Sequence, residues 1–188
     1  METPKHAPQR PMDAGEPPAE GLTPAAFAAS YRTYAVPLYR YFYQHIGNAA
    51  DAEDLTATTI SKALAGLASY AGRAPLAAWL FGIARHTLHD FQRHRGTSVP
   101  LADADASLAD ATPLPEQSVV AQERWGDLHA RIRRLPANQR EALTLRYFGA
   151  LPIAEIALVL DRSDGAVKLL IHRALTTLRA QYRQEDQP

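Results

Sequence analysis

Basic and imidazole side chains recur at helical spacing in two stretches of the sequence, and groups of this kind can contact nucleic acid. In the second stretch they lie off an apolar stripe, with one leucine among them, and all four positions are free to face a DNA groove: Lys168, Leu169, His172 and Arg173. Arginine can pair bidentately with guanine or hold a phosphate, so Arg173 allows either contact. Arg162 and Ser163 come directly before this stretch, and we expect Arg162 to contact phosphate.

The first stretch combines cations with an aromatic ring. Opening a duplex requires replacement of lost base stacking and neutralisation of phosphate, which suits basic and aromatic groups. Trp79 is spaced i, i+4 from Ile83, and we interpret it as a core residue. The exposed basic residues are then the candidates for contact with opened DNA: Arg85, His86, His89, Arg93 and Arg95.

A metal site is the alternative chemistry for the same helix. His86, His89, Asp90 and His94 place metal-ligand types along one helical face. The basic surroundings oppose a bound cation, and no second ligand cluster exists elsewhere. The sequence also contains no phosphate-cradling glycine-rich loop and no nucleophile motif. A metal-dependent enzyme therefore depends on this cluster alone, and we expect no cofactor and no catalytic activity.

Two short helices must position the second basic stretch. Ile153, Ile156, Ala157 and Leu160 form one apolar stripe, and residues 161–163 form a polar break. Ser163 can cap the next helix and Asp164 complements its dipole. A second apolar stripe follows at Val167, Leu170, Ile171, Ala174 and Leu178. The spacing predicts a helix-turn-helix whose second helix can enter a major groove, although a helical hairpin from another bundle has the same periodicity.

The remaining pattern predicts an all-α protein with two small helical domains joined by a flexible acidic linker. Residues 1–24 are rich in proline and predict a disordered tail. Helical patterning over 25–95 includes two apolar faces on separate helices. The first face is formed by Leu55, Thr59, Ile60, Ala63, Leu64 and Leu67, and the second by Leu80, Ile83, Ala84, Leu88 and Phe91. The pattern disappears over 96–118, where four acidic residues occur without a base, and helices resume over 119–183.

Charge distribution explains how a chain of 188 residues with zero net charge could bind DNA. Residues 73–95 carry four arginines against one acid, and residues 121–188 carry eleven cations against eight acids. The local field governs binding more than the total charge does. The sequence has no cysteine, which excludes disulfides and thiolate sites. We expect no membrane insertion, no signal peptide and a cytoplasmic location.

Both halves, in this order, resemble sigma factors of the sigma-70 family, of the extracytoplasmic-function (ECF, group 4) type. The motif NAADAEDLTATTISKAL is similar to the family's acidic polymerase-docking motif, and PLAAWLFGIARHTLHDFQRHR to its minus-10 segment. The stretch LPANQREALTLRYFGALPIAEIALVLDRSDGAVKLLIHRAL is similar to the domain that reads the minus-35 element. The sequence departs from the family's pattern at Ile60, His86, Ala166 and at Leu169-Leu170, where Leu169 removes a polar group.

The resemblance implies a transcription initiation factor that binds core RNA polymerase and promoter DNA. Polymerase contacts would come from Asp51, Glu53, Asp54 and Leu55, although acids in a first helical turn also serve as dipole compensation. The loop 69–74, with Arg73, would border a pocket for an unpaired minus-10 base. The acidic linker would thread into polymerase channels, and the presence of an anti-sigma partner stays open. A helix-turn-helix regulator that binds duplex DNA without polymerase is the other DNA-binding alternative.

Overall fold

The computed structural model describes residues 22–97 and 119–185, and these residues form α-helices and one 3-10 helix without any strand. The predicted all-α class is confirmed. The predicted tail 1–24 and linker 96–118 lie outside the described residues except at their ends. The elements are α1 Pro24–Ile46, α2 Ala49–Gly66, η1 Leu67–Ser69, α3 Leu76–Thr97, α4 Val119–Arg133, α5 Ala137–Tyr147, α6 Ile153–Leu160 and α7 Asp164–Glu185.

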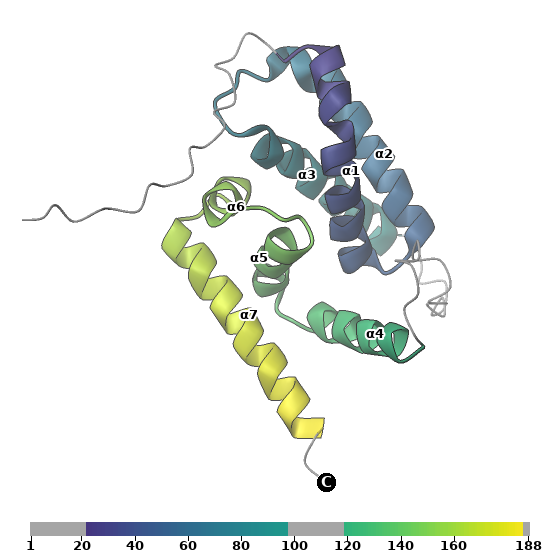
Figure 1. Ribbon diagram of the computed structural model, residues 1–188, viewed down its shortest axis with the longest axis vertical. Helices are drawn as coiled ribbons and strands as arrows, with labels where there is room; N and C mark the ends of the chain where they lie inside the picture. Colours follow the sequence, from purple (N-terminus) through teal and green to yellow (C-terminus); the bar gives the residue numbers. More distant parts are fainter. Residues whose placement is uncertain (1–21, 98–118, 186–188) are drawn as a thin grey trace, which may run out of the picture.

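In the first half, α1, α2 and α3 pack around a shared apolar core (Figure 1). The Thr23 side chain caps α1 by accepting a hydrogen bond from the Ala26 amide at 3.2 Å. At the other end Gly47 adopts φ 76°, a left-handed conformation that costs glycine nothing, and its N–H bonds the Tyr43 carbonyl. The fully buried core side chains of this half include Phe27, Leu38, Phe42, Leu80 and Phe81.

In the second half, α6 and α7 form the predicted helix-turn-helix, with α5 packed against both. Asp161 ends α6 in the left-handed region at φ 51°, which aspartate tolerates better than most residues. The Ser163 hydroxyl accepts a hydrogen bond from the Ala166 amide at 3.3 Å, so the predicted cap on α7 is confirmed. The predicted apolar stripe of α7 is also confirmed, because Leu170 packs partly buried against the core and the other four members are buried: Val167, Ile171, Ala174 and Leu178.

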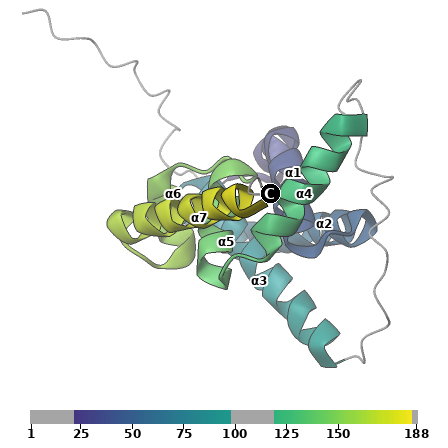
Figure 2. The ribbon, with the colours of Figure 1, turned by 90° about the horizontal axis from the view of Figure 1, so that it is seen from below.

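The two halves pack against each other. Helix α3 contacts α6, and α1 contacts both α4 and α5 (Figures 1 and 2). At one point the approach requires glycine: a Cβ on Gly149 would lie 2.9 Å from Phe81 Cε1 of the other half and 2.8 Å from the Leu145 carbonyl oxygen. The sequence predicted two small helical domains joined by a linker, and the two helical halves are present, but it did not predict their direct contact.

Candidate nucleic-acid and protein-binding surfaces

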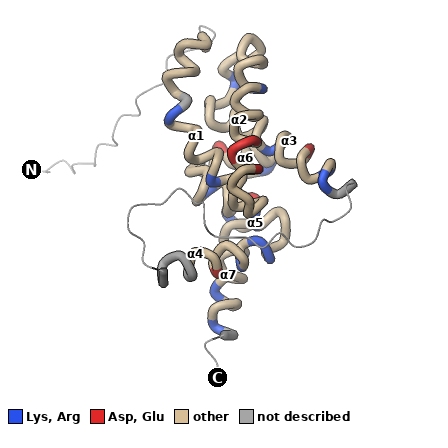
Figure 3. The backbone as a smooth tube through the Cα atoms, turned by 90° about the vertical axis from the view of Figure 1, so that its right-hand side faces the viewer, with Lys and Arg blue, Asp and Glu red and all other residues tan. Residues whose placement is uncertain are grey.

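One exposed face of α7 carries the residues predicted to read duplex DNA. Lys168, Leu169, His172 and Arg173 are all exposed, whereas the opposite side of the helix enters the core. Lys and Arg positions follow α7 along its length in Figure 3. Within the described part of the chain, neither Lys168 nor Arg173 forms an ion pair. Arg162 is also exposed, in the turn that precedes the helix.

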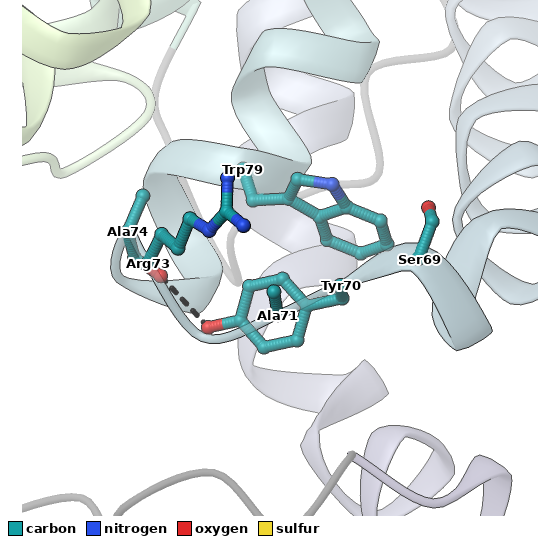
Figure 4. A pocket seen from close by; sticks show the side chains of 6 residues that line it. All are labelled: Ser69, Tyr70, Ala71, Arg73, Ala74 and Trp79. Atoms are coloured by element: carbon teal, nitrogen blue, oxygen red, sulfur yellow. Dashed lines mark hydrogen bonds between the residues drawn. The ribbon is translucent and has the colours of Figure 1, made fainter.

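A hollow of about 290 Å³ lies between the end of η1 and the start of α3. Tyr70 and Trp79 line it with their ring centroids 4.9 Å apart, and the Tyr70 hydroxyl donates a 2.8 Å hydrogen bond to the Ala74 carbonyl (Figure 4). That bond closes the loop 69–74, which the resemblance placed beside a pocket. The sequence assigned Trp79 to the core alone, but this half-buried ring also forms a wall of the hollow. The full lining is Ser69, Tyr70, Ala71, Arg73, Ala74 and Trp79.

The basic residues of α3 are exposed, and all three of its arginines have an acidic partner. Arg93 Nη2 lies 2.6 Å from Asp90 Oδ1, and Arg95 Nη1 lies 3.1 Å from Asp51 Oδ2. The second pair joins a predicted DNA-binding residue to a predicted polymerase-binding residue, which their distance in sequence did not reveal. Both pairs are solvent-accessible, and exposed pairs contribute only ~0–1 kcal/mol, so a competing anion can displace them. The other exposed basic residues of α3 are Arg85, which lies near Glu141, and His86, His89 and His94.

The predicted acidic docking residues open α2 in different environments. Asn48 caps the helix by accepting a 2.9 Å hydrogen bond from the Asp51 amide. Glu53 and Asp54 are exposed, and Asp51 is half-buried. Leu55 is only 7% exposed and belongs to the core, so its predicted part in polymerase binding can only be indirect. Leu64, which the periodicity assigned to the buried face, is instead 44% exposed.

The structure gives no support to the metal-site alternative. Among residues 22–97 and 119–185, no three His, Cys, Asp or Glu side chains gather closely enough to hold a metal ion. Asp90 faces cations instead, because Lys62 Nζ lies 3.8 Å from its Oδ2 and Arg93 bonds its Oδ1. The hypothesis of a metal-dependent enzyme therefore has no supporting geometry in this part of the chain.

A buried polar cluster joins the two halves, and sequence reasoning missed it. The Tyr41 hydroxyl of α1 donates a 2.7 Å hydrogen bond to Oε1 of Glu141 in α5. His45 Nε2 lies 3.3 Å from Glu141 Oε2, and Arg85 Nε lies 4.0 Å from Glu141 Oε1. Burial raises the pKa of Glu141. Burial, together with the charge of Arg140, lowers the pKa of His45 to about 3, so its imidazole is neutral near pH 7.

A second histidine lies at the same contact, on α4. The His129 ring is 5.2 Å from the Tyr43 ring of α1, centroid to centroid. Burial and the nearby charge of Arg133 lower the pKa of His129 to about 4. The contact between the halves therefore contains two imidazoles that are neutral near pH 7. No spacing rule links residues about a hundred positions apart, so only the folded structure could reveal this arrangement.

Comparison with known proteins identifies both halves. Residues 30–97 match the family described as Sigma-70 region 2, and residues 125–178 match the family described as Sigma-70, region 4. The ECF RNA polymerase sigma factor BldN of Streptomyces coelicolor is 37% identical over 158 residues, covering 81% of this chain and 59% of BldN. The ECF RNA polymerase sigma factor SigW of Bacillus subtilis is 30% identical over 169 residues, covering 84% and 89%.

Solved structures share the fold at lower identity. The sigma factor RpoE from Bartonella quintana, solved in complex with the anti-sigma factor NepR, aligns with a TM-score of 0.66 at 22% identity. That alignment covers 84% of this chain and 96% of RpoE. CnrH, solved with the cytosolic domain of CnrY, also aligns at 0.66, with 21% identity, and the match covers 87% and 92% of the two chains. In the described residues, no helix has the length and apolar character needed to cross a membrane.

Proposed function

Since the chain belongs to the sigma-70 family, as an extracytoplasmic-function sigma factor that directs RNA polymerase to promoters, we propose that its two halves divide promoter recognition between them. The observation that carries this proposal is the order of the two matches, region 2 over 30–97 and region 4 over 125–178. The functional units would be the predicted ones, 25–95 for docking and the minus-10 element and 119–183 for the minus-35 element. Catalysis of RNA synthesis would remain with the polymerase, in the cytoplasm where its promoters are.

The minus-35 element is assigned to the exposed face of α7. A helix-turn-helix presents its second helix to the major groove, and α7 is that helix. Lys168, His172 and Arg173 supply the donors that base edges and phosphates require. Arg162 lies in the turn before α7, where a cation can hold the backbone of the duplex, and the Ser163 cap begins the helix.

The minus-10 element is assigned to α3 and to the hollow beside it. The Tyr70 and Trp79 rings offer apolar faces for an unpaired base, and Arg73 adds a cation at the same hollow. A volume of about 290 Å³ is near the lower limit of the ~300–1,000 Å³ typical of small-molecule sites. The exposed basic groups of α3 would hold the phosphates of the opened strand: Arg85, His86, His89, Arg93 and Arg95.

Polymerase docking is assigned to the exposed acids at the start of α2. Glu53 and Asp54 are accessible to a partner, and Asp51 becomes more accessible once Arg95 leaves it for DNA. Leu55 supports these residues from the core. An anti-sigma protein would be a further partner able to cover the same surfaces. The stand-alone regulator stays as the alternative, and it needs no such acidic surface.

Binding to both promoter elements requires the packed halves to separate. The names of the elements put them about 25 base pairs apart, roughly 85 Å at ~3.4 Å per base pair. The longest helix, α1, has 23 residues and is only ~35 Å long. The residues between Thr97 and Val119 can span on the order of 70 Å when extended, so the covalent connection allows the separation. The contact around Tyr41 and Glu141 would then break.

Run-off transcription with core RNA polymerase and a library of promoters tests the proposal. The chain should associate with core polymerase and direct transcription from a subset of promoters that share two spaced elements. A stand-alone regulator would bind duplex DNA equally well without polymerase and would not co-purify with it. Failure to associate with core polymerase, with duplex binding intact, would replace the proposal by that alternative.

A further inference from the structure

Leu169 is an exposed apolar side chain in the middle of a surface that otherwise suits DNA. It is 46% exposed, although the buried stripe of the same helix begins two residues earlier at Val167. The cations Lys168 and Arg173 and the imidazole of His172 surround it on the exposed side of α7. Exposure of a large aliphatic group costs free energy that burial against an apolar partner would recover.

The surface of α7 between Leu169 and the N-terminus of the helix is formed by small residues and is open. Gly165 and Ala166 are one turn earlier on the same face, at i−4 and i−3. A Cβ added to Gly165 would meet no atom within 4 Å, so no group among the described residues covers this turn. A bulky partner can therefore approach closely at the start of α7, and the Leu169 side chain then projects toward it.

We propose that Leu169 selects thymine at one position of the minus-35 element by packing against its C5-methyl group. This inference depends on the proposed assignment of α7 to the minus-35 element. The thymine methyl is the apolar group that the four standard bases display in the major groove, where other base atoms are donors or acceptors. The flanking cations attract an anionic partner, so this surface favours a nucleic acid over the apolar surface of another protein.

The expected size of the effect follows from the burial of one methyl group. Such burial is worth ~0.8 kcal/mol, which corresponds to about a fourfold change in affinity. Cytosine at that position would offer an exocyclic amino group to a side chain that cannot accept its hydrogen bond. Discrimination against cytosine should therefore exceed fourfold, because a desolvated donor without a partner adds its own cost.

Replacement of single thymines by deoxyuridine is the direct test, because it removes only the methyl group. A preferred minus-35 duplex is first selected from a random library by the full chain with core polymerase. Each thymine of that duplex is then replaced in turn, and affinity is measured for the wild type, Leu169→Ala and Leu158→Ala. Leu158 is a matched control, since it is 57% exposed on the neighbouring helix α6. Alanine favours helix, so neither variant should lose its fold.

The wild type and Leu158→Ala should lose about fourfold in affinity at one thymine, whereas Leu169→Ala should lose nothing further there. This coupling between one side chain and one methyl group is what a double-mutant cycle isolates. The inference is overturned if no thymine shows the loss, or if the loss persists in Leu169→Ala. Selection of no duplex at all would overturn the proposed function as well, so the two failures are distinguishable.

Discussion

The Tyr41 hydroxyl donates a 2.7 Å hydrogen bond to Oε1 of Glu141, and this bond crosses from the first half of the protein to the second. Tyr41 is fully buried, and burial together with Glu141 raises the pKa of its phenol well above the usual value. The phenol therefore stays protonated and remains a donor across the accessible pH range. Glu141 is partly buried, so removal of this bond from its carboxylate costs free energy.

We expect Tyr41→Phe to destabilise the contact between the halves. The ring contacts of Tyr41 with Phe42, His45 and Phe81 would survive, so the change removes chiefly the hydrogen bond to Glu141. Loss of this hydrogen bond to a partly buried acceptor should cost ~1–3 kcal/mol, which is measurable as a lower urea midpoint. Tyr147→Phe is the matched control, because Tyr147 is 59% exposed and its change should stay within ~0.5 kcal/mol. Equal midpoints for the two variants would refute the role of the bond.

Acid should loosen the same contact. The folded protein holds the pKa of His45 at about 3 and that of His129 at about 4, whereas unfolded histidine titrates near ~6.5. Below about pH 6.5 both histidines become protonated in the unfolded chain but stay neutral in the folded protein. The stability contributed by each histidine is therefore present above ~6.5 and is lost as pH falls toward its folded pKa. The expected slope is ~1.4 kcal/mol per pH unit for each histidine.

The Glu141 carboxyl acts in the opposite sense. Burial raises its pKa in the folded state, so acid favours the fold as this carboxyl takes up its proton earlier than in the unfolded chain. Urea unfolding between pH 7 and 4 should show a steeper acid loss in Glu141→Gln and a shallower one in His45→Gln. His172→Gln, which changes an exposed histidine outside this contact, is the control variant. A His45→Gln slope identical to the wild type would contradict this account.

Helical periodicity was enough to predict the all-α class, because the helices bury apolar stripes and three of the described helices begin at a side-chain cap. The stripe at Val167, Ile171, Ala174 and Leu178 and the Ser163 cap depend only on neighbours in sequence. The hollow at 69–74 was inferred by resemblance, and its wall at Trp79 was missed because i, i+4 spacing cannot distinguish a core ring from one that is half-buried.

Contacts between distant residues could not be predicted in this way. The spacing of residues along α5 does not indicate a partner for Glu141. Its partial burial results from the packing of α5 on α1. The pairing of Arg95 with Asp51 likewise depends on how α3 crosses the start of α2. Leu64 follows the correct period yet is 44% exposed, because none of the described elements covers that turn.

Cleavage between residues 98 and 118 should leave two fragments that remain together. The sequence of this stretch predicts a protease-sensitive linker, and α1 and α3 contact α4, α5 and α6 directly. Size-exclusion chromatography at pH 7 after limited proteolysis should show one species, and the Tyr41→Phe fragments should separate more readily. Fragments that separate at once in the wild type would contradict a stable contact between the halves.

Charge reversal at Asp54 should weaken polymerase binding without loss of the fold. Asp54 is exposed in the first turns of α2, outside the apolar core, so its side chain is available to a partner. Asp54→Arg turns attraction into repulsion and should slow association with core polymerase, and Asp54→Asn should give a smaller effect in the same direction. Affinity is measured beside circular dichroism of the free protein. Unchanged affinity with native helicity would remove Asp54 from the docking surface.

Arginines at the two DNA-facing surfaces should act on different steps of promoter recognition. Arg173 is exposed on α7 and forms no ion pair within the described residues, so its guanidinium is available to a duplex. Arg173→Ala should weaken binding of a minus-35 duplex. If Arg173 contacts a base edge, the loss should be ~1–3 kcal/mol and specificity should relax at one position. If it contacts only phosphate, all sequences should weaken alike and the salt slope should fall by about one unit.

The combined change of Arg93→Ala and Arg95→Ala should spare the minus-35 duplex and reduce promoter opening. Their present partners, Asp90 and Asp51, hold them in exposed pairs that contribute only ~0–1 kcal/mol, so phosphates of the opened strand can compete for both guanidinium groups. Permanganate reactivity of unpaired thymines in the polymerase complex reports opening, and duplex affinity is measured in parallel. The division of labour fails if this variant opens promoters normally, or if Arg173→Ala leaves affinity, specificity and salt slope unaltered.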